Sequence, residues 1–249
     1  MKLAASRPWS GTATLAAAAV LASLLTACAA TAPGAHNELV PLSRLAPTVV
    51  QDMRYFGANN FVGRPIAGYE APQCWLSQAA AHSLARVQHD LAAHGLGLKV
   101  FDCYRPQMAV DDFVRWGADL ADQRTKAEYY PRVPKSELFA RGYIAEKSGH
   151  SRASTADLTL VVQDATRATQ VIAGPVALGQ EVDMGTPFDL FDEHSHTEDA
   201  EQPPAVRRNR LWLRALMQSH GWRNLPEEWW HYTLADEPWP QRYFTRPVR

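Results

Sequence analysis

The sequence predicts a mixed fold of α-helices and β-strands in one domain, on three observations. Apolar residues recur every three or four positions in segments 77–94 and 204–220, which is the period of a helix with one buried face. Segments 96–104 and 158–162 are instead rich in apolar and β-branched residues, as strands are. With 249 residues, 46% of them apolar and 20% charged, the chain has the size and composition of one globular domain.

The first 27 residues are typical of an export signal and are excluded from the predicted fold. Lys2 and Arg7 precede an apolar stretch, 15–25, that is too short to span a bilayer as a helix. The stretch ends in Leu-Thr-Ala-Cys, which resembles a bacterial lipoprotein signal and predicts cleavage before Cys28 and lipidation of its sulfur. The alternative is an ordinary signal peptide with an incidental cysteine.

We therefore expect a signal peptide over 1–27, a tether over 28–39 and the folded domain over 40–249. The domain would face the periplasm and would meet the membrane only through its lipid anchor. The formal net charge of −1 creates no strong field for nucleic acid, so we expect no nucleic-acid partner. The sequence leaves the oligomeric state open.

Export also affects the interpretation of the three cysteines. If Cys28 is lipidated, Cys74 and Cys103 remain as an even pair in an oxidising compartment, which predicts a disulfide between them. Two separate buried thiols are the alternative. A metal-binding role is disfavoured, because neither cysteine has a nearby Cys or His at ligand spacing.

The first half of the domain begins with an expected short strand, 48–55, and an irregular segment, 56–72, rich in Gly, Asn and Pro. A helix over 77–94 follows, and Gly95 provides its stop signal. Its predicted buried face consists of Ala80, Leu84, Val87 and Leu91. Three histidines of this helix are expected at the surface or in ordinary packing: His82, His89 and His94.

The next predicted strand, 96–104, leads into Arg105-Pro106, and the proline opens a helix over 107–121. The apolar side of this helix is expected to hold Val110, Phe113, Val114 and Leu120. An arginine between a strand end and a helix start can be held rigidly and point into a cleft. A surface salt bridge is the alternative for Arg105.

The middle of the chain contains a polar connection, 122–135, and then an expected short helix, 136–141, with Ser136 as its N-cap. A strand is predicted to start at Asp157, with His150 on the loop before it. Residues 163–206 have no clear period and suggest a long surface loop. His194 and His196 on this loop could form a metal pair by composition, but we expect them to be solvated.

The last part predicts a helix over 204–220 and a strand over 229–234. The buried side of the helix is expected to hold Val206, Leu213, Leu216 and Met217. Glu228 and His231 lie three positions apart, so on a straight strand they would point to opposite faces. If they act together, the chain must turn or bulge at Glu228.

Four residues form a chemically coherent set. His150, Asp157 and His231 offer two imidazoles and a carboxylate, which is the three-ligand pattern of a catalytic zinc site with one open position. Glu228 is then available as a general base for the attacking water. Arg105 could hydrogen-bond the carbonyl oxygen as it gains charge. These residues predict a peptidase with one zinc ion per chain.

Several motifs make the chain resemble the zinc D,D-peptidases, in particular the D-alanyl-D-alanine dipeptidases of the VanX type. The resemblance covers about residues 40–249 and extends to D,D-carboxypeptidases and the hedgehog amino-terminal domain. The motifs are Gly68-Tyr69-Glu70, Asp102-x-Tyr104-Arg105-Pro106, Gly142-Tyr143, Ser148-x-His150-Ser151-Arg152-x-Ser154-x-x-Asp157-Leu158-Thr159-Leu160, Met184-Gly185, Phe188-Asp189 and Glu228-Trp229-Trp230-His231-Tyr232.

The resemblance implies an α+β fold, with a small, mainly antiparallel sheet flanked by helices. It implies zinc on His150, Asp157 and His231, with Glu228 as base and Arg105 as the carbonyl-polarising group. It further places Tyr55, Ser148 and Asp189 around the amino terminus of the substrate, and Asp102 close to Arg105. The implied reaction is hydrolysis of D-Ala-D-Ala or a similar short cell-wall D,D-dipeptide.

Two other functions stay open at this point. One is a D,D-carboxypeptidase acting on peptidoglycan stem peptides, which would not require a free amino group beside the scissile bond. The other is a non-catalytic lipoprotein that binds cell-wall peptide or zinc. The chain departs from the family pattern at Gly149, where a serine is usual, at Cys103, where a glycine is usual, and in the longer segment 163–206.

Overall fold

A computed structural model describes residues 38–249, which contain the whole predicted domain from residue 40 onwards. The predicted signal peptide, most of the tether and Cys28 lie outside the described residues. Within 38–249, no helix combines the length and the hydropathy that crossing a membrane requires.

The centre of the domain is a five-stranded sheet with the order β2-β4-β5-β7-β6. Strands β4, β5, β7 and β6 pair antiparallel in that order, and only the short β2 runs parallel to β4. A second sheet pairs β1 with β3. The α+β fold with a small, mainly antiparallel sheet is therefore confirmed. The strands are β1 (Leu39–Pro41), β2 (Val50–Gln51), β3 (Trp75–Ser77), β4 (Leu96–Asp102), β5 (Thr155–Val162), β6 (Trp222–Asn224) and β7 (His231–Leu234).

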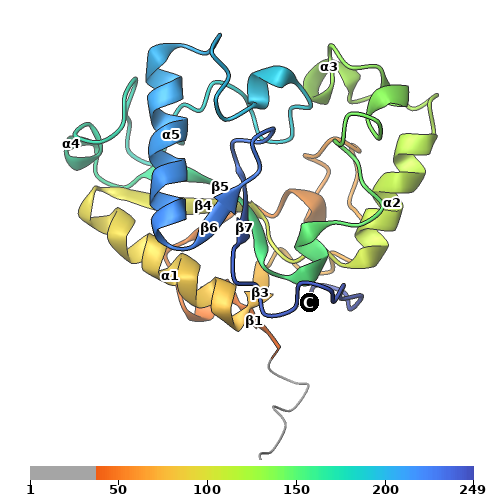
Figure 1. Ribbon diagram of the computed structural model, residues 1–249, viewed down its shortest axis with the longest axis horizontal. Helices are drawn as coiled ribbons and strands as arrows, with labels where there is room; N and C mark the ends of the chain where they lie inside the picture. The colour runs from red at the N-terminus through yellow and green to blue at the C-terminus, as the bar shows by residue number, and fades with distance from the viewer. Residues whose placement is uncertain (1–37) are drawn as a thin grey trace, which may run out of the picture. The chain divides into compact units, whose positions relative to one another are not determined.

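Helices flank the central sheet. Figure 1 shows α1 and α5 to the left of the labelled strands, and α2 and α3 to the right. Every residue of β5 is buried, as expected for a central strand that is covered on both faces. The α-helices are α1 (Gln78–Ala93), α2 (Gln107–Ala118), α3 (Lys126–Tyr129), α4 (Ala165–Ala168) and α5 (Pro204–Ser219). The 3₁₀ helices are η1 (Leu42–Arg44), η2 (Arg54–Phe56), η3 (Lys135–Glu137), η4 (Gly149–Arg152) and η5 (Glu193–Ser195).

The local sequence explains why α1 begins and ends where it does. The Ser77 side chain caps its start by accepting a hydrogen bond from the Ala80 N–H. Gly95 follows its end at φ +69, and a Cβ there would lie 2.5 Å from the Asp164 carbonyl oxygen, so glycine is required. The predicted apolar face is buried, and it consists of Ala80, Leu84, Val87 and Leu91.

Several predicted elements differ from the structure. The short helix 136–141 is wrong: Pro134 precedes a single 3₁₀ turn, η3. The helix from 107 ends at Ala118, and Leu120 beyond it is 54% exposed instead of buried. The strand at 48–55 is reduced to β2, because a 3₁₀ turn at Arg54–Phe56 bends the chain. The last strand starts at His231 instead of 229.

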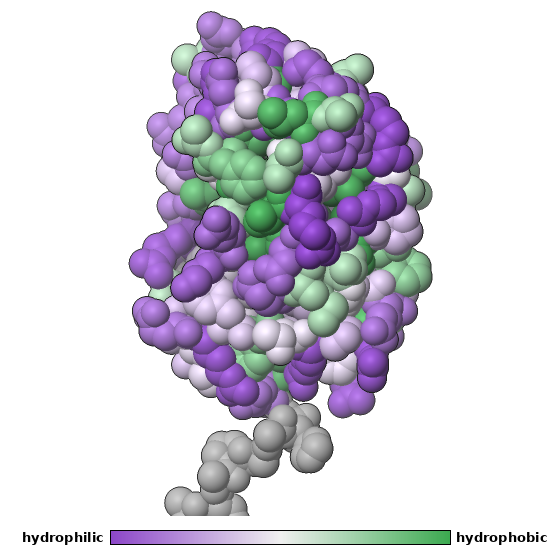
Figure 2. Space-filling model, turned by 90° about the vertical axis from the view of Figure 1, so that its right-hand side faces the viewer, coloured by the Kyte–Doolittle hydropathy of each residue, from purple (hydrophilic) through white to green (hydrophobic). Residues whose placement is uncertain are grey.

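The face that carries α2 and α3 is mixed in polarity. Figure 2 shows hydrophobic side chains recessed between hydrophilic ones on this side of the molecule. A cluster of buried aromatic side chains lies in this part of the domain. In it, Phe61 contacts Phe113, Trp116 and Phe191 with ring centroids 4.7–5.2 Å apart. Such rings bury a large area and form a rigid support for the residues above them.

Candidate active site

Three polar residues lie in a row across the central sheet. Asp102 at the end of β4 is the cross-strand partner of Asp157 on β5, and Asp157 is in turn the partner of His231 on β7. Directly paired residues project from the same face of a sheet, so the row presents its side chains together. Asp157 is the third residue of its strand, which starts at Thr155 and not at Asp157 as predicted.

His150 reaches this row from η4. The Ser148 hydroxyl caps that 3₁₀ helix by accepting a hydrogen bond from the His150 N–H. Ala153 ends it at φ 61 and turns the chain into β5. As a result, one nitrogen each of His150 and His231 and one oxygen of Asp157 all lie within 4.8 Å of one another.

The atoms of this triad fit a metal ion. His150 Nε2 and Asp157 Oδ1 are buried and make no hydrogen bond of acceptable geometry within the described residues. They do lie close to other polar atoms: His150 Nε2 is 3.3 Å from Asp157 Oδ2, and His231 Nδ1 is 3.1 Å from Asp157 Oδ1. Buried polar atoms without partners are costly, and coordination by a metal would satisfy them. Two imidazoles and one carboxylate suit zinc and related divalent ions.

Electrostatics hold Asp157 and His231 in opposite charge states when no metal is present. Burial alone would raise the pKa of Asp157, but the imidazoles of His150 and His231 close to its oxygens outweigh burial and lower that pKa below its usual range. Burial alone would lower the pKa of His231, but Asp157 and Glu228 raise it to about 10. A metal that binds to His231 must therefore displace a proton from it.

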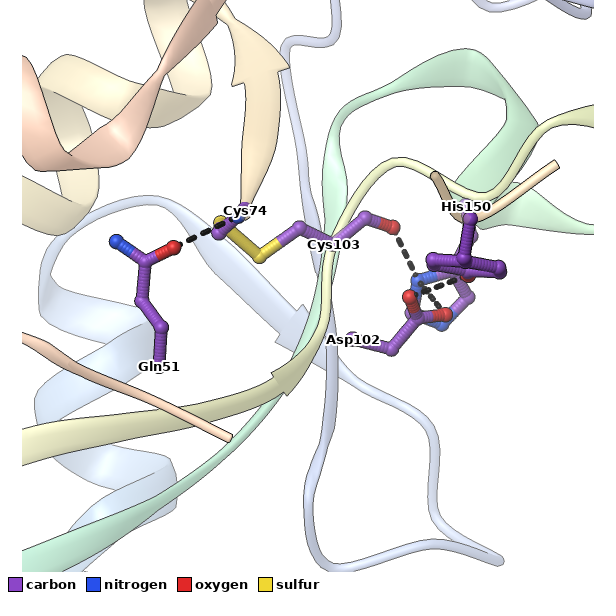
Figure 3. The surroundings of a disulfide bond; sticks show 6 residues. Gln51, Cys74, Asp102, Cys103 and His150 are labelled. Atoms are coloured by element: carbon purple, nitrogen blue, oxygen red, sulfur yellow. Dashed lines mark hydrogen bonds and ion pairs between the residues drawn. A yellow bond between two sulfur atoms is a disulfide. The ribbon is translucent and has the colours of Figure 1, made fainter. Parts of the chain in front are cut away.

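The orientation of His150 is fixed from behind. Its Nδ1 lies 2.7 Å from the carbonyl oxygen of Cys103, as Figure 3 shows. A carbonyl oxygen can only accept a hydrogen bond, so Nδ1 carries the proton and Nε2 is left free to face the triad. A histidine ligand oriented by a backbone carbonyl is a common arrangement in metal sites.

Arg105 points into the same site and does not form a surface salt bridge. Its Nε donates to Asp102 Oδ2 at 2.9 Å, and its Nη2 lies 3.8 Å from Asp157 Oδ2. Its guanidinium carbon lies 5.0 Å from the centre of the Tyr55 ring. Burial would lower the pKa of Arg105, but the Asp102 charge outweighs it and raises the pKa, so the guanidinium stays charged.

Behind Arg105, the hydroxyl of Tyr69 donates to Asp102 Oδ1 at 2.6 Å. Asp102 is fully buried, and each of its oxygens accepts a hydrogen bond, Oδ1 from Tyr69 and Oδ2 from Arg105. Tyr69 belongs to the Gly68-Tyr69-Glu70 motif, but no local pattern predicts this contact, because its partner lies 33 residues away.

Glu228 stands beside the triad on a turn. The His231 N–H donates to the Glu228 carbonyl oxygen at 3.2 Å, which closes the turn that the spacing of these residues required. Glu228 Oε2 consequently lies 3.4 Å from His231 Nδ1. Two buried tryptophans anchor the turn, and the Trp229 indole N–H donates to Thr186 Oγ1 at 2.9 Å.

A buried carboxylate, Asp189, lies on the wall of the site. The Tyr55 hydroxyl donates to its Oδ2 at 2.8 Å. Burial raises the pKa of Asp189 well above its ordinary value, and the charges of Asp157 and Glu228 raise it further. Its backbone has φ 64, a conformation that non-glycine residues adopt at a cost. This combination of strain and an uncompensated acid is typical of a ligand-binding position.

The loop that carries Asp189 is organised by Arg210 on α5. The Arg210 side chain is fully buried and donates to the backbone carbonyl oxygens of Met184, His194 and His196. No carboxylate in 38–249 forms an ion pair with it, so burial lowers its pKa to about 10. Sequence reasoning missed this residue, since its partners are backbone atoms.

The two histidines of this loop do not join the metal site. His194 Nδ1 instead lies 2.9 Å from Asp199 Oδ2, and both histidines are partly exposed. The histidines expected on α1 are exposed or partly exposed, as predicted. Cys74 and Cys103, the pair expected from the sequence, are joined by a disulfide.

A single cavity of about 220 Å³ collects almost all of the predicted site residues. Of the predicted metal-binding, catalytic and substrate-binding residues, only Asp102 is absent from its wall, since it lies buried behind Arg105. The predicted residues that line it are Tyr55, Arg105, Ser148, His150, Asp157, Asp189, Glu228 and His231.

Comparison with known proteins gives one consistent result. A family model described as D-ala-D-ala dipeptidase matches residues 35–249. A D-alanyl-D-alanine dipeptidase of Enterococcus faecalis is 40% identical over 213 residues, covering 86% of this chain and 99% of the relative. The enzyme of that name in Streptomyces coelicolor is 40% identical over 197 residues, covering 79% and 91%. The one in Escherichia coli is 30% identical over 198 residues, covering 80% and 85%.

The matched segment contains the whole cavity and the triad that can hold a metal. The chain therefore belongs to the D-ala-D-ala dipeptidase family of metallopeptidases.

Proposed function

We propose that the protein is a zinc-dependent dipeptidase that hydrolyses D-Ala-D-Ala or a similar short cell-wall D,D-dipeptide. The observation that carries this proposal is the content of one cavity, whose wall contains a triad that can hold a metal, the Glu228 carboxylate, the Arg105 guanidinium and the buried acid Asp189. The names of the relatives supply the substrate class.

His150, Asp157 and His231 would hold the metal. When bound there, a zinc ion supplies Lewis acidity, which lowers the pKa of water and polarises a carbonyl group. The hydrogen bond from His150 Nδ1 to the Cys103 carbonyl oxygen keeps His150 Nε2 directed at the site. This preorganisation reduces the reorganisation that binding requires.

Glu228 is positioned to act as the general base. Its carboxylate is partly exposed to the cavity and lies 3.4 Å from a triad nitrogen, so water approaching the triad comes within its reach. It can accept a proton from that water and pass it to the amine that leaves as the peptide bond breaks. Arg105 would donate to the carbonyl oxygen as negative charge develops on it.

Asp189 and Tyr55 would bind the free amino group of the dipeptide. A substrate ammonium is the counter-ion that the buried Asp189 carboxylate lacks among the described residues. This need for a free amino group beside the scissile bond favours a dipeptidase over a D,D-carboxypeptidase, whose substrates have acylated nitrogen there.

The test is a time-course assay with three peptides. Purified protein loaded with zinc is incubated with D-Ala-D-Ala, L-Ala-L-Ala and a stem pentapeptide, and free alanine is measured. We expect release from D-Ala-D-Ala alone. Release from the pentapeptide at a similar rate would instead support the carboxypeptidase, and no release from any peptide would contradict both.

We also propose that the protein is exported and anchored through lipidated Cys28, on the strength of its Leu-Thr-Ala-Cys motif. Cell fractionation of Cys28→Ala should move the protein out of the membrane fraction. An unchanged distribution would contradict the proposed anchor.

A further inference from the structure

The disulfide between Cys74 and Cys103 joins two segments that meet behind the metal-binding triad. Cys74 directly precedes β3, Cys103 directly follows β4, and they lie 29 residues apart in sequence. Both are fully buried, and neither lines the cavity. The disulfide therefore cannot touch a substrate, and any effect on the site must pass through its neighbours.

The Cys74 side is held firmly by the surrounding backbone. Its N–H donates to Gln51 Oε1 at 2.8 Å, and its carbonyl accepts from the Leu42 N–H at 2.9 Å. Figure 3 shows Gln51 and the disulfide on one side of β4 and His150 on the other. The next residue, Trp75, belongs to β3 and accepts a hydrogen bond from the Tyr104 N–H.

The Cys103 side lies at the centre of the site's supporting contacts. Its carbonyl oxygen is the acceptor for His150 Nδ1, at 2.7 Å. The residue before it, Asp102, holds Arg105 through the 2.9 Å ion pair. The Arg105 N–H in turn donates to the His150 carbonyl oxygen at 3.3 Å. A shift of Cys103 would thus disturb the metal ligand and the guanidinium at once.

We propose that the Cys74–Cys103 disulfide is a positioning element of the active site, which fixes the Cys103 carbonyl so that His150 and Arg105 keep their orientations. The inference rests on the proposed metal-dependent function. Tyr55 and Asp189 reach the cavity from other segments and are hydrogen-bonded to each other. Tyr55 meets the Asp102–Arg105 segment only through its ring, which lies against Arg105 and Tyr69, and no hydrogen bond within 38–249 joins Tyr55 or Asp189 to Cys103. Loss of the disulfide should therefore weaken zinc binding and turnover while leaving recognition of the substrate amino group nearly intact.

The experiment compares the oxidised protein with the double variant Cys74→Ala/Cys103→Ala. Zinc affinity is measured by competition with a chromogenic chelator, and kcat and KM are measured for D-Ala-D-Ala at saturating zinc. Loss of a contact that orients a ligand typically costs about 10- to 100-fold in metal affinity or activity. We expect a loss of about that size in zinc affinity and a lower kcat, with KM changed less than about threefold.

A matched control separates positioning from general stability. Leu91→Ala removes a fully buried side chain from α1, outside the cavity, and should lower the melting temperature of the metal-free protein as disulfide loss does. The control should keep wild-type zinc affinity and kcat. If the double variant behaves like this control, the disulfide only stabilises the fold and the inference is wrong.

A second measurement is available if the double variant does not fold. The folded wild-type protein is treated with a phosphine, which reduces the disulfide to two thiols and is itself oxidised to the phosphine oxide, with water supplying the oxygen and the two protons. The reagent is removed, and far-ultraviolet dichroism and thiol counting verify a folded, reduced protein before zinc affinity is measured. Equal zinc affinity before and after reduction overturns the proposal. Failure of the proposed function would appear in the oxidised wild-type protein itself, as absent zinc binding or absent hydrolysis.

Discussion

Replacement of Asp189 by asparagine should make the metal-free protein more stable and a poorer enzyme. Asp189 is 5% exposed and receives a hydrogen bond from Tyr55, but in 38–249 no basic group forms an ion pair with it. Burial first, and then the charge of Asp157, raise its pKa well above the ordinary value. Asparagine keeps the shape and the oxygen that accepts from Tyr55, and it removes the buried charge.

The pH dependence gives the sign of the stability change. An acid with a raised pKa in the folded state costs nothing below its unfolded pKa, where it is protonated in both states. The cost develops as pH rises through the two pKa values and is complete above the folded one, at about 1.4 kcal/mol for each unit that separates them. The gain from Asp189→Asn should therefore be absent near about pH 3 and largest in neutral or alkaline solution.

Typical single stabilising substitutions yield about 0.5–2 kcal/mol, and in a domain of this size each kcal/mol raises Tm by about 2–4 °C. Thermal melts of both metal-free proteins across this pH range measure the difference. Loss of a charged partner for the substrate ammonium should cost about 1.5–3 kcal/mol, or about 10- to 150-fold in KM. A variant that is less stable at every pH, or that keeps the wild-type KM, would refute the reasoning.

Three further predictions concern the metal, the chemistry and the long loop. His150→Ala and His231→Ala should each lose stoichiometric zinc by metal analysis, and tight zinc in both variants would contradict the triad as the ligand set. Glu228→Ala and Arg105→Ala should keep zinc and the fold but lower kcat by about 10²–10⁴ and 10²–10³ respectively; zinc loss from Glu228→Ala would make the glutamate a ligand. Arg210→Met should leave buried carbonyl oxygens without hydrogen-bond donors and destabilise the protein by about 3 kcal/mol or more. It should also raise KM more than the Kd for zinc. Equal effects on both constants would show that the Asp189 loop and the metal site depend on each other.

The chemical residues were predictable because only a few residue types can do this work. Histidines and carboxylates at 150, 157, 228 and 231 stood out by type and spacing, and the structure collects them in one cavity. The long helices were also predictable, since α1 and α5 each maintain a buried stripe over 16 residues. Both facts depend on information that is local in the sequence.

The remaining features depend on contacts between distant segments. Strands β1, β3 and β6 have three residues each, too few to show a period, and pairing alone defines them. Arg210 is missed because its partners are backbone carbonyls, which every residue possesses. The turn at Glu228 was required by the chemistry, but the shortened last strand that it produces could not be derived from the residues alone.

The geometry of the row formed by Asp102, Asp157 and His231 does not depend on the length of the connections between the strands. The row depends on strand pairing, in which a shift by one residue would turn a ligand to the opposite face of the sheet. The connections can change length without altering that pairing, because a surface loop closes at a cost that grows only slowly with its length. Under the proposed function, insertions in the segment between β5 and α5, which bears Asp189, would change which peptides enter while the geometry of His150, Asp157 and His231 stays constant. For protein engineering, the proposed roles would make specificity and metal chemistry two independently adjustable parts of this scaffold.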